Sequence, residues 1–348
     1  MGIYIRGILT VVPTRVRTTS GFAEQFGQEE TERIAAMTGV REVRIVAPGQ
    51  TAADLGEAAA SRLLARLNVA PRDVQGIVFV TQTPDYVLPA TACILQNRLG
   101  LGKQSLAFDV NLGCSAYPYG LAIVASLLSA GLAKRVLLIT ADTVSRLAHP
   151  CEKATTPLFG DAAVATLLES DEEDNDLLGV ELGTDGGGWK NLIQPIGQQR
   201  FRTTGEFAAA RPESLANIER PEYISMNGTE IFTFTLREVP GIVQRTLVAA
   251  GLENQDVDYF FFHQANKFIL DHLIRKMRLP PEKCLLSIER FGNTSGPSPA
   301  VTACVAAAQI NRDRSLVAMF VGFGVGYSWG GVLARLRPGT LWPLEEMV

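Results

Sequence analysis

The sequence predicts an α/β fold made of two similar halves, and two observations carry this prediction. Short apolar runs, none longer than a β-strand needs, alternate with stretches of helical pattern. Such alternation favours an α/β architecture. The order of these elements in the first part of the chain recurs in the second part, which indicates duplication of one structural unit.

The elements of the first half begin with a helix. Residues 51–67 have a helical pattern, and the apolar run that follows at 76–81 is short enough to be a strand. After a connecting helix, a second strand is predicted at 105–110, and it leads into the small-residue turn Gly113-Cys114-Ser115-Ala116. A helix at 119–130 and a strand at 135–140 complete the unit.

The second half follows the same order. It contains a helix at 231–250, a strand at 257–262, a helix at 267–277, a strand at 284–288, a polar turn at 292–295, a helix at 299–309 and a strand at 316–321. From strand end to turn the distance is 34 residues in one half (80 to 114) and 31 in the other (262 to 293). The repeat of about 180 residues is too long for a solenoid. We therefore expect halves at 1–174 and 175–348, packed face to face, with Cys114 and Asn293 at related positions.

The composition excludes several classes of protein. At 348 residues and 47% hydrophobic the chain can bury a large core, yet no apolar run could span a bilayer, and the first residues lack the regions of a signal peptide. A net charge of −4 gives no bulk attraction to nucleic acid or to an anionic membrane. Five scattered cysteines without a CxxC pair indicate free thiols and no metal site. We expect a cytoplasmic protein, with the acidic run 171–176 as a solvated turn.

One cysteine stands in a distinctive context. Cys114 follows a predicted strand and opens a predicted helix. A thiol at a helix N-terminus meets the positive end of the helix dipole and unpaired N–H groups, which should lower its pKa toward the thiolate. Most free cysteines are instead small buried apolar residues. We expect this of Cys93, Cys284 and Cys304, and we expect Cys151 to lie in a polar loop without a role.

A histidine and an asparagine follow strands of the second half. His263 comes after the run 260–262, and catalytic groups in α/β sheets gather at the carboxyl ends of strands. Asn293 lies in the polar turn. Each has a structural alternative, a satisfied structural histidine (expected for His272, which falls in the middle of a predicted helix) or a turn-forming asparagine. Their joint placement with Cys114 favours chemistry, because a thiol needs a proton partner and an amide can add a second donor to one oxyanion.

The glycine-rich segment 322–330 adds a further signal. It matches a dinucleotide-binding loop only loosely, because it leads into another strand-like run rather than a helix. A tight turn whose backbone N–H points at a reacting carbonyl fits it better. Together with the cysteine, histidine and asparagine, this turn predicts acyl-transfer chemistry on thioesters.

With these residues identified, the chain resembles the β-ketoacyl-acyl-carrier-protein synthase III family of the thiolase superfamily. The resemblance covers nearly the whole length and rests on seven segments in the family's order, at 38–42, 109–114, 159–163, 226–228, 263–266, 292–295 and 322–330. It implies a five-layer αβαβα thiolase fold, usually a homodimer, and a triad of Cys114, His263 and Asn293. Chain-elongating synthases have Cys-His-His and thiolases Cys-His-Cys, so Asn293 separates the subfamilies.

The resemblance also implies two half-reactions and no cofactor beyond acyl-CoA or acyl-carrier substrates. The Cys114 thiolate attacks an acyl thioester while the backbone N–H groups of Cys114 and Val325 hold the oxyanion. Malonyl-acyl carrier protein then enters, and His263 Nε2 and Asn293 Nδ2 donate to its thioester oxygen during decarboxylation. The resulting enolate attacks acyl-Cys114 and gives a β-ketoacyl product.

The chain departs from the family at positions that bind substrate. A Trp and an Arg that clamp the adenine of CoA in acetyl-CoA-using relatives are Arg33 and Met37 here, and an Arg after the His-Gln-Ala-Asn segment is Phe268. Leu88 replaces a tunnel-capping Phe, which implies a longer or branched acyl chain and a specialised lipid or secondary-metabolite pathway. The resemblance does not extend to 198–220 or 337–348. It implies an acyl pocket lined by Leu88, Phe159, Met226, Gly228 and Phe323.

The helix after His263 is predicted to dock a carrier protein. Three basic residues, Lys267, Arg275 and Arg278, fall near one face, and Lys276 is adjacent to them. An acidic carrier needs such a local patch on a net negative enzyme. The alternative is an ordinary solvated helix face. Two other functions stay open, an acyltransferase that forms an ester or amide and a non-catalytic partner subunit, although retention of all three site residues disfavours the latter. The sequence leaves acyl length, donor carrier and pathway undetermined.

Overall fold

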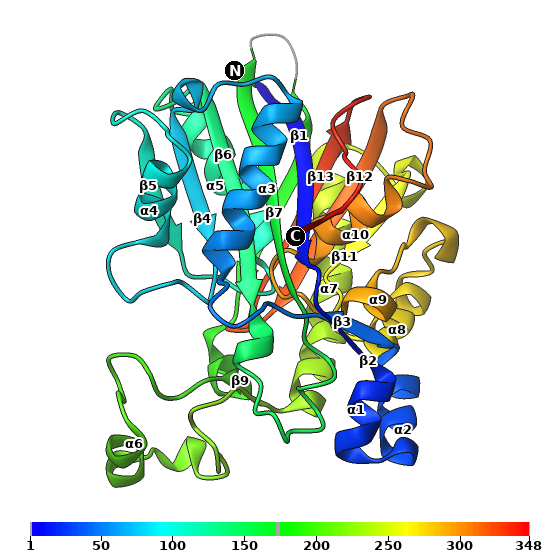
Figure 1. Ribbon diagram of the computed structural model, residues 1–348. Helices are drawn as coiled ribbons and strands as arrows, with labels where there is room; N and C mark the ends of the chain where they lie inside the picture. The colour runs from blue at the N-terminus through cyan, green and yellow to red at the C-terminus, as the bar shows by residue number, and fades with distance from the viewer. Residues whose placement is uncertain (1, 172–174, 348) are drawn as a thin grey trace.

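The computed structural model describes residues 2–171 and 175–347, which form two main β-sheets and three layers of helices (Figure 1). A six-stranded sheet contains, in order, β14 (Glu345–Met347), β1 (Gly2–Pro13), β7 (Asp161–Asp171), β6 (Arg135–Thr143), β4 (Gly76–Val80) and β5 (Leu106–Val110). A four-stranded sheet contains β11 (Tyr259–Phe262), β12 (Leu316–Gly324), β13 (Ser328–Leu336) and β8 (Leu177–Thr184). Two ribbons pair β2 (Val16–Thr18) with β3 (Glu42–Arg44) and β9 (Leu192–Ile193) with β10 (Ser225–Met226).

Helices cover both faces of each main sheet. The outer face of the six-stranded sheet carries α3 (Ala52–Arg66) and α4 (Thr91–Arg98), and that of the four-stranded sheet carries α7 (Gly228–Ala250) and α8 (Lys267–Met277). Between the sheets, α5 (Ala116–Ser129) and α10 (Ser298–Ala306) contact strands of both. The predicted five-layer αβαβα fold is therefore confirmed. Shorter helices lie outside these layers: α1 (Thr19–Phe26), α2 (Gln28–Thr38), α6 (Thr204–Ala210) and α9 (Ile288–Phe291).

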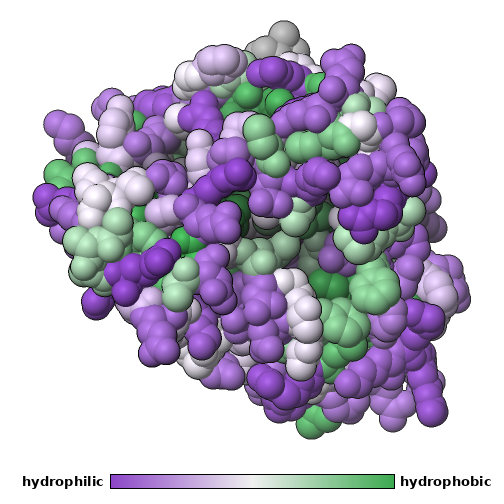
Figure 2. All heavy atoms as spheres, turned by 90° about the horizontal axis from the view of Figure 1, so that it is seen from below, coloured by the Kyte–Doolittle hydropathy of each residue, from purple (hydrophilic) through white to green (hydrophobic). Residues whose placement is uncertain are grey.

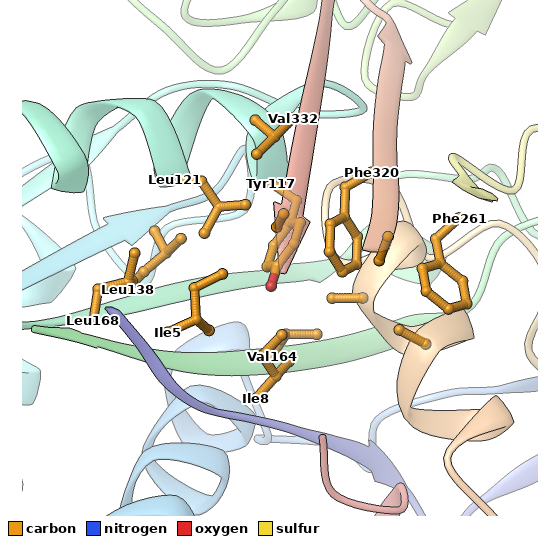
Figure 3. Packing of buried hydrophobic residues seen from close by; sticks show 14 of the residues in the cluster. Ile5, Ile8, Tyr117, Leu121, Leu138, Val164, Leu168, Phe261, Phe320 and Val332 are labelled. Atoms are coloured by element: carbon orange, nitrogen blue, oxygen red, sulfur yellow. The ribbon is translucent and has the colours of Figure 1, made fainter. Parts of the chain in front are cut away.

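Alternate residues of a buried strand serve different layers. In β4, Val80 belongs to the middle cluster and Phe79 to the outer one, as the two-residue period of a strand requires. Figure 3 shows the middle cluster, where Tyr117 of α5 packs edge-on against Phe320 of β12 with ring centroids 5.1 Å apart. Because helices cover both faces, the strands are apolar along their length. This is why short apolar runs marked them in the sequence.

The two main sheets repeat one pattern of strand directions. β4 is parallel to β6, β6 antiparallel to β7, and β7 antiparallel to β1; β11, β12, β13 and β8 have the same relations in the same order. The prediction of a strand at 284–288 is wrong. Only Cys284 forms a bridge, to Phe260, whereas all of β5 pairs with β4. The N–H groups of Ser287 and Ile288 donate instead to the side chain of Gln264, which removes them from a ladder.

Two local predictions are also wrong. Asp176, at the end of the acidic run, is fully buried and accepts hydrogen bonds from the Ile5 N–H at 3.1 Å and from Arg337 Nε at 2.9 Å. It therefore links β1 to the residue that follows β13 instead of lying in a solvated turn, while 172–174 of that run lie outside the described residues. Cys93 is exposed on α4, because the neighbours that face the core are Ala92 and Leu95.

The segment 194–224 leaves the body of the molecule between β9 and β10, at the lower left of Figure 1. It contains α6 and an apolar cluster of its own, formed by Ile196, Phe201, Phe207, Leu215 and Ile218. This excursion includes the residues 198–220 to which the family resemblance does not extend. Within the described ranges no helix combines the length and apolar character needed to cross a membrane.

Candidate active site

Three segments meet near the carboxyl ends of the parallel strands. Cys114 lies after β5, His263 directly follows β11, and Asn293 follows α9, where its backbone bridges to Phe159. All four residues line one cavity of about 180 Å³. The cysteine, histidine and asparagine are 8%, 2% and 6% exposed. The fold thus brings the three predicted residues into one buried site.

The Cys114 thiol is enclosed by backbone. Burial raises its pKa to about 11, because it disfavours the thiolate, whereas the N–H groups of Val325 and of Cys114 itself act in the opposite direction. The expectation of a lowered pKa is therefore wrong. The helix α5 begins only at Ala116, and desolvation outweighs the nearby N–H groups. Gly324 permits this close packing, since a β-carbon there would lie 2.7 Å from Cys114 Sγ.

His263 is a neutral, buried imidazole. Burial lowers its pKa from 6.5 to about 4, and a backbone contact with Ser295 opposes the shift. Its Nδ1 lies 2.7 Å from Ser298 Oγ, and the same oxygen accepts the backbone N–H of Gln264 at 3.2 Å. The ring of Phe323 packs edge-on against the imidazole with centroids 5.4 Å apart. The histidine is therefore fixed in orientation and uncharged at neutral pH.

Backbone hydrogen bonds orient the amide of Asn293. Its Oδ1 accepts the N–H of Ser295 at 2.9 Å, and its Nδ2 donates to the carbonyl of Ala265 at 3.4 Å. An amide nitrogen has two hydrogens, so one remains beyond this bond. Ser295 has a φ of +58°, a left-handed conformation that is uncommon outside glycine and that the surrounding structure must hold in place.

Asp142 is a buried acid that sequence reasoning missed. It lies near the end of β6, is 0% exposed, and accepts hydrogen bonds from Gln82 N (2.8 Å), Thr81 Oγ1 (3.1 Å) and Gly296 N (3.4 Å). Burial raises its pKa to about 6. Its carboxylate joins the loop after β4 to the loop that holds Asn293. The sequence signal for Asp142 was a lone acidic residue at the end of an apolar run. The sequence contained no comparable signal for Ser298.

Four of the five predicted acyl-pocket residues line the cavity: Phe159, Met226, Gly228 and Phe323. Leu88 does not. It is 79% exposed on the loop between β4 and α4, beside Tyr86 and Val87, which are 61% and 64% exposed. Leu88 therefore does not lie in the cavity of its own chain.

A wider hollow adjoins the buried cavity and shares Met226, Gly228 and Ile269 with it. It measures about 580 Å³ and is lined in part by Met37, Phe232 and Phe268. On the lower face of the molecule, apolar surface interrupts the mainly polar surface around a hollow (Figure 2).

The basic groups at this mouth are balanced by two acids. Arg33 lies 2.9 Å and Lys153 3.7 Å from the carboxylate of Glu30, and Glu152 also lines the hollow. The mouth therefore combines apolar surface with a charge cluster of two bases and two acids.

The predicted docking residues lie on α8, which Asn266 caps by accepting the N–H of Ile269 at 2.7 Å. Lys267 pairs with Asp271 at 2.6 Å, and Lys276 Nζ donates to the carbonyl of Leu236 at 2.7 Å. Arg275 contacts the His272 ring, and Arg278 ends the helix with a φ of +53°. The basic groups therefore spread from the mouth of the hollow to the far end of α8, and Lys267, Arg275 and Lys276 already have partners.

Comparison with known proteins places this architecture in a class. The family model described as 3-oxoacyl-[acyl-carrier-protein (ACP)] synthase III matches residues 108–186, and its C-terminal counterpart matches 247–336. Proteins named beta-ketoacyl-[acyl-carrier-protein] synthase III from Alkalilimnicola ehrlichii and Agrobacterium fabrum are 34% and 33% identical, and each alignment covers 95% of this chain and 98% of the relative. The crystal structure of a 3-oxoacyl-(acyl-carrier protein) synthase from Burkholderia xenovorans superposes with a TM-score of 0.91 at 37% identity, over 100% of this chain and 97% of that one.

The fold and these relatives define an acyltransferase of the thiolase fold. More specifically, the chain belongs to the 3-oxoacyl-[acyl-carrier-protein] synthase III family, as its motifs predicted. Among the described residues no cluster of three or more His, Cys, Asp or Glu side chains is arranged to hold a metal ion.

Proposed function

We propose that this enzyme condenses an acyl group, carried on Cys114, with malonyl-acyl carrier protein and releases CO₂ to give a β-ketoacyl product. The observation that carries the proposal is the convergence of Cys114, His263 and Asn293 on one buried cavity, with the Val325 N–H facing the thiol. The names of the relatives support the same substrate class, because each is a beta-ketoacyl-acyl-carrier-protein synthase III.

In the first half-reaction, Cys114 Sγ attacks the carbonyl carbon of an acyl thioester. The N–H groups of Cys114 and Val325 hold the oxyanion of the tetrahedral intermediate, which then expels the donor thiolate. That thiolate takes up the proton lost by the cysteine, so a thioester is exchanged for a thioester. Because burial raises the pKa of Cys114 to about 11, the resting group is a neutral thiol, and its proton must be given up for the attack.

In the second half-reaction, the malonyl thioester places its carbonyl oxygen against His263 and Asn293. Both donors are neutral, so they gain most from the negative charge that develops as the carboxylate leaves as CO₂. The enolate carbon attacks acyl-Cys114, a C–C bond forms, and the Cys114 thiolate leaves and is reprotonated. Each donor is expected to contribute about 3 kcal/mol to lowering this barrier. The mechanism uses no metal or cofactor.

The acyl chain is proposed to lie among Phe159, Met226, Gly228 and Phe323, which line the cavity. The malonyl carrier is proposed to dock on α8 through Lys267, Arg275, Lys276 and Arg278, next to the mouth of the adjoining hollow.

The donor is proposed to be carrier-bound rather than a free CoA ester. The pairing of Arg33 with Glu30 and the exposed Met37 and Phe268 support this, because CoA phosphates need unpaired cations. These departures also support a role in a specialised lipid or secondary-metabolite pathway of the cytoplasm.

A homodimer is proposed to complete the acyl tunnel. β5 lies at the edge of its sheet, and an open strand edge is a surface for pairing. The adjacent loop exposes Tyr86, Val87 and Leu88 in a row. In a symmetric dimer this loop would reach the partner's cavity, and Leu88 would limit acyl length there. The chain is proposed to divide into its two halves, 1–174 and 175–348, between β7 and β8.

The test combines mass spectrometry with CO₂ release. Purified enzyme is incubated with a panel of acyl-CoA and acyl-carrier donors, and intact mass detects acyl-Cys114; malonyl-acyl carrier protein is then added. CO₂ release in step with loss of the adduct and formation of a β-ketoacyl product supports the proposal. Transfer of the acyl group to an alcohol or amine without CO₂ release would instead identify an ester- or amide-forming enzyme. The absence of an adduct with every donor would favour a non-catalytic subunit.

A further inference from the structure

Ser298 lies where it can decide which nitrogen of His263 carries the proton. The serine is fully buried at the start of α10 and the histidine is 2% exposed, so bulk water does not supply their hydrogen bonds. The Ser298 oxygen has two partners, the backbone N–H of Gln264 at 3.2 Å and His263 Nδ1 at 2.7 Å. Both distances are within the range of good hydrogen bonds.

The proton count of this contact has one arrangement that satisfies both the Gln264 N–H and the serine hydroxyl. The Gln264 N–H can only donate, so Ser298 Oγ accepts from it. Among the hydrogen bonds of the described residues, the serine hydroxyl has no acceptor other than His263 Nδ1. A buried hydroxyl without an acceptor would cost free energy. The hydroxyl therefore donates to Nδ1, which must be unprotonated to accept.

The tautomer of the histidine follows from this bond. His263 is neutral at pH 7, because burial lowers its pKa to about 4, and a neutral imidazole has one N–H. With Nδ1 accepting, that N–H is at Nε2. A protonated Nε2 can donate to an oxyanion, but it cannot at the same time accept a proton from Cys114.

We propose that Ser298 is a positioning residue that locks His263 in the Nε2–H tautomer, so that the histidine is a permanent donor for decarboxylation and not the base that deprotonates Cys114. The identity of the step rests on the proposed function, whereas the tautomer does not.

The direct test is the ¹⁵N NMR spectrum of wild-type enzyme labelled on histidine. The chain has three histidines, and the His263→Ala variant assigns the signal. Two-bond ¹H–¹⁵N correlations distinguish a protonated from a bare ring nitrogen. The proposal expects a bare Nδ1 and a protonated Nε2 at pH 7. The rival arrangement, with the proton on Nδ1, would overturn it without any mutation of Ser298.

A variant then tests the kinetic consequence. Ser298→Ala removes the hydroxyl that fixes the tautomer, so the Nε2–H signal should be replaced by a mixture or by Nδ1–H. Condensation by preloaded acyl-enzyme should fall roughly 10- to 100-fold, the size of effect known for removal of the hydrogen-bond partner of a metal-binding histidine. The rate of acyl loading should stay close to wild type. Equal losses in the two steps would contradict the donor-only role.

Ser287→Ala is the matched control. It also removes a buried hydroxyl next to α10, one that contacts Thr302 Oγ1 at 2.7 Å and not His263. Ser287→Ala should leave the His263 tautomer and the ratio of the condensation rate to the loading rate unchanged. If this variant changes the tautomer and the ratio as Ser298→Ala does, Ser298 acts only through packing. If the enzyme does not condense its acyl group with malonyl-acyl carrier protein but NMR shows the Nε2–H tautomer, the proposed function fails while the tautomer assignment stands.

Discussion

The ends of β4 and β11 occupy equivalent places in the two halves, but the side chains that follow them differ in chemical character. Thr81 follows β4, and its hydroxyl donates to buried Asp142 at 3.1 Å. His263 follows β11, and its ring meets the hydroxyl of Ser298. By the strand pairing, Phe323 of β12 corresponds to Asp142 of β6. One half thus has a carboxylate network where the other has an aromatic ring packed against an imidazole.

The glutamines that come next differ as well. Gln82 lines the cavity, whereas Gln264 is buried and its side chain accepts the N–H groups of Ser287 and Ile288. That bond ends strand pairing after Cys284, so the second half has a single bridge where the first has a complete β5. The fold shared by the two halves therefore positions a nucleophile in one half and hydrogen-bond donors in the other. The fold determines where these residues lie, and the residue types at the strand ends determine what they can do chemically.

The sharpest test of this division is the nucleophile. Cys114→Ala should abolish the acyl adduct seen by intact mass, because a methyl group cannot form a thioester. Cys151→Ala and Cys304→Ala should load acyl groups like wild type. An undiminished adduct on the Cys114→Ala protein would mean that the first half does not carry the nucleophile.

The donors of the second half are expected to matter in the other step. His263→Ala and Asn293→Ala should still load an acyl group, yet lose roughly 10²- to 10³-fold in decarboxylative condensation, because each removes one donor to the developing enolate. Single-turnover assays with preloaded enzyme measure this step alone. If both variants condense at the wild-type rate once loaded, the division between the halves is wrong.

The carboxylate of the first half should be visible in the pH dependence of stability. Burial raises the pKa of Asp142 from 3.8 to about 6, so the folded state binds its proton more tightly than the unfolded state. Its contribution to stability is fully present below about pH 4 and is lost as the pH rises through 6.

Denaturant unfolding of wild type and of Asp142→Asn at pH 4 and pH 7 measures this term. The free energy of unfolding of wild type should fall between these pH values by on the order of 3 kcal/mol more than that of the variant. Asp161 also has a pKa raised to about 6 by burial, and because it is present in both proteins its effect cancels. Identical pH dependence would show that Asp142 is already ionised at little cost.

The connections after β4 and β11 extend the comparison to the surface. The first exposes Leu88 on an apolar loop. Leu88→Phe should shift donor preference several-fold toward shorter acyl chains, because a larger side chain would shorten the tunnel of the partner subunit. Competition between donors of different length gives the preference, and size-exclusion chromatography with light scattering gives the oligomeric state. An unchanged preference in a confirmed dimer would show that the tunnel runs elsewhere.

The second connection contains the basic helix α8. Reversal of Arg275 and Arg278 to Glu should raise KM for carrier-bound substrate a few-fold, more at low salt, and leave turnover of small thioester analogues nearly unchanged. Loss on both types of substrate would show that these residues serve folding. Loss on neither would place the carrier on another surface.

The sequence by itself determined the layered α/β fold and the three candidate residues. Strands buried on both faces are short and apolar, and this property is local, so the runs at 76–81 and 316–321 were visible without a structure. Cys114, His263 and Asn293 could be identified from the sequence for the same local reason, because each lies at a turn that follows an apolar run or the helix after it.

Tertiary structure decided the rest. The raised pKa of Cys114, the network around Asp142 and the bond from Ser298 to His263 each depend on which groups surround a buried atom. The loss of strand pairing after Cys284 depends on a glutamine 20 residues earlier in the chain. Periodicity in a sequence reports which face of an element is buried. It does not report the partners that segments distant in the chain bring to that face, and those partners set the protonation and hydrogen bonding on which the chemistry depends.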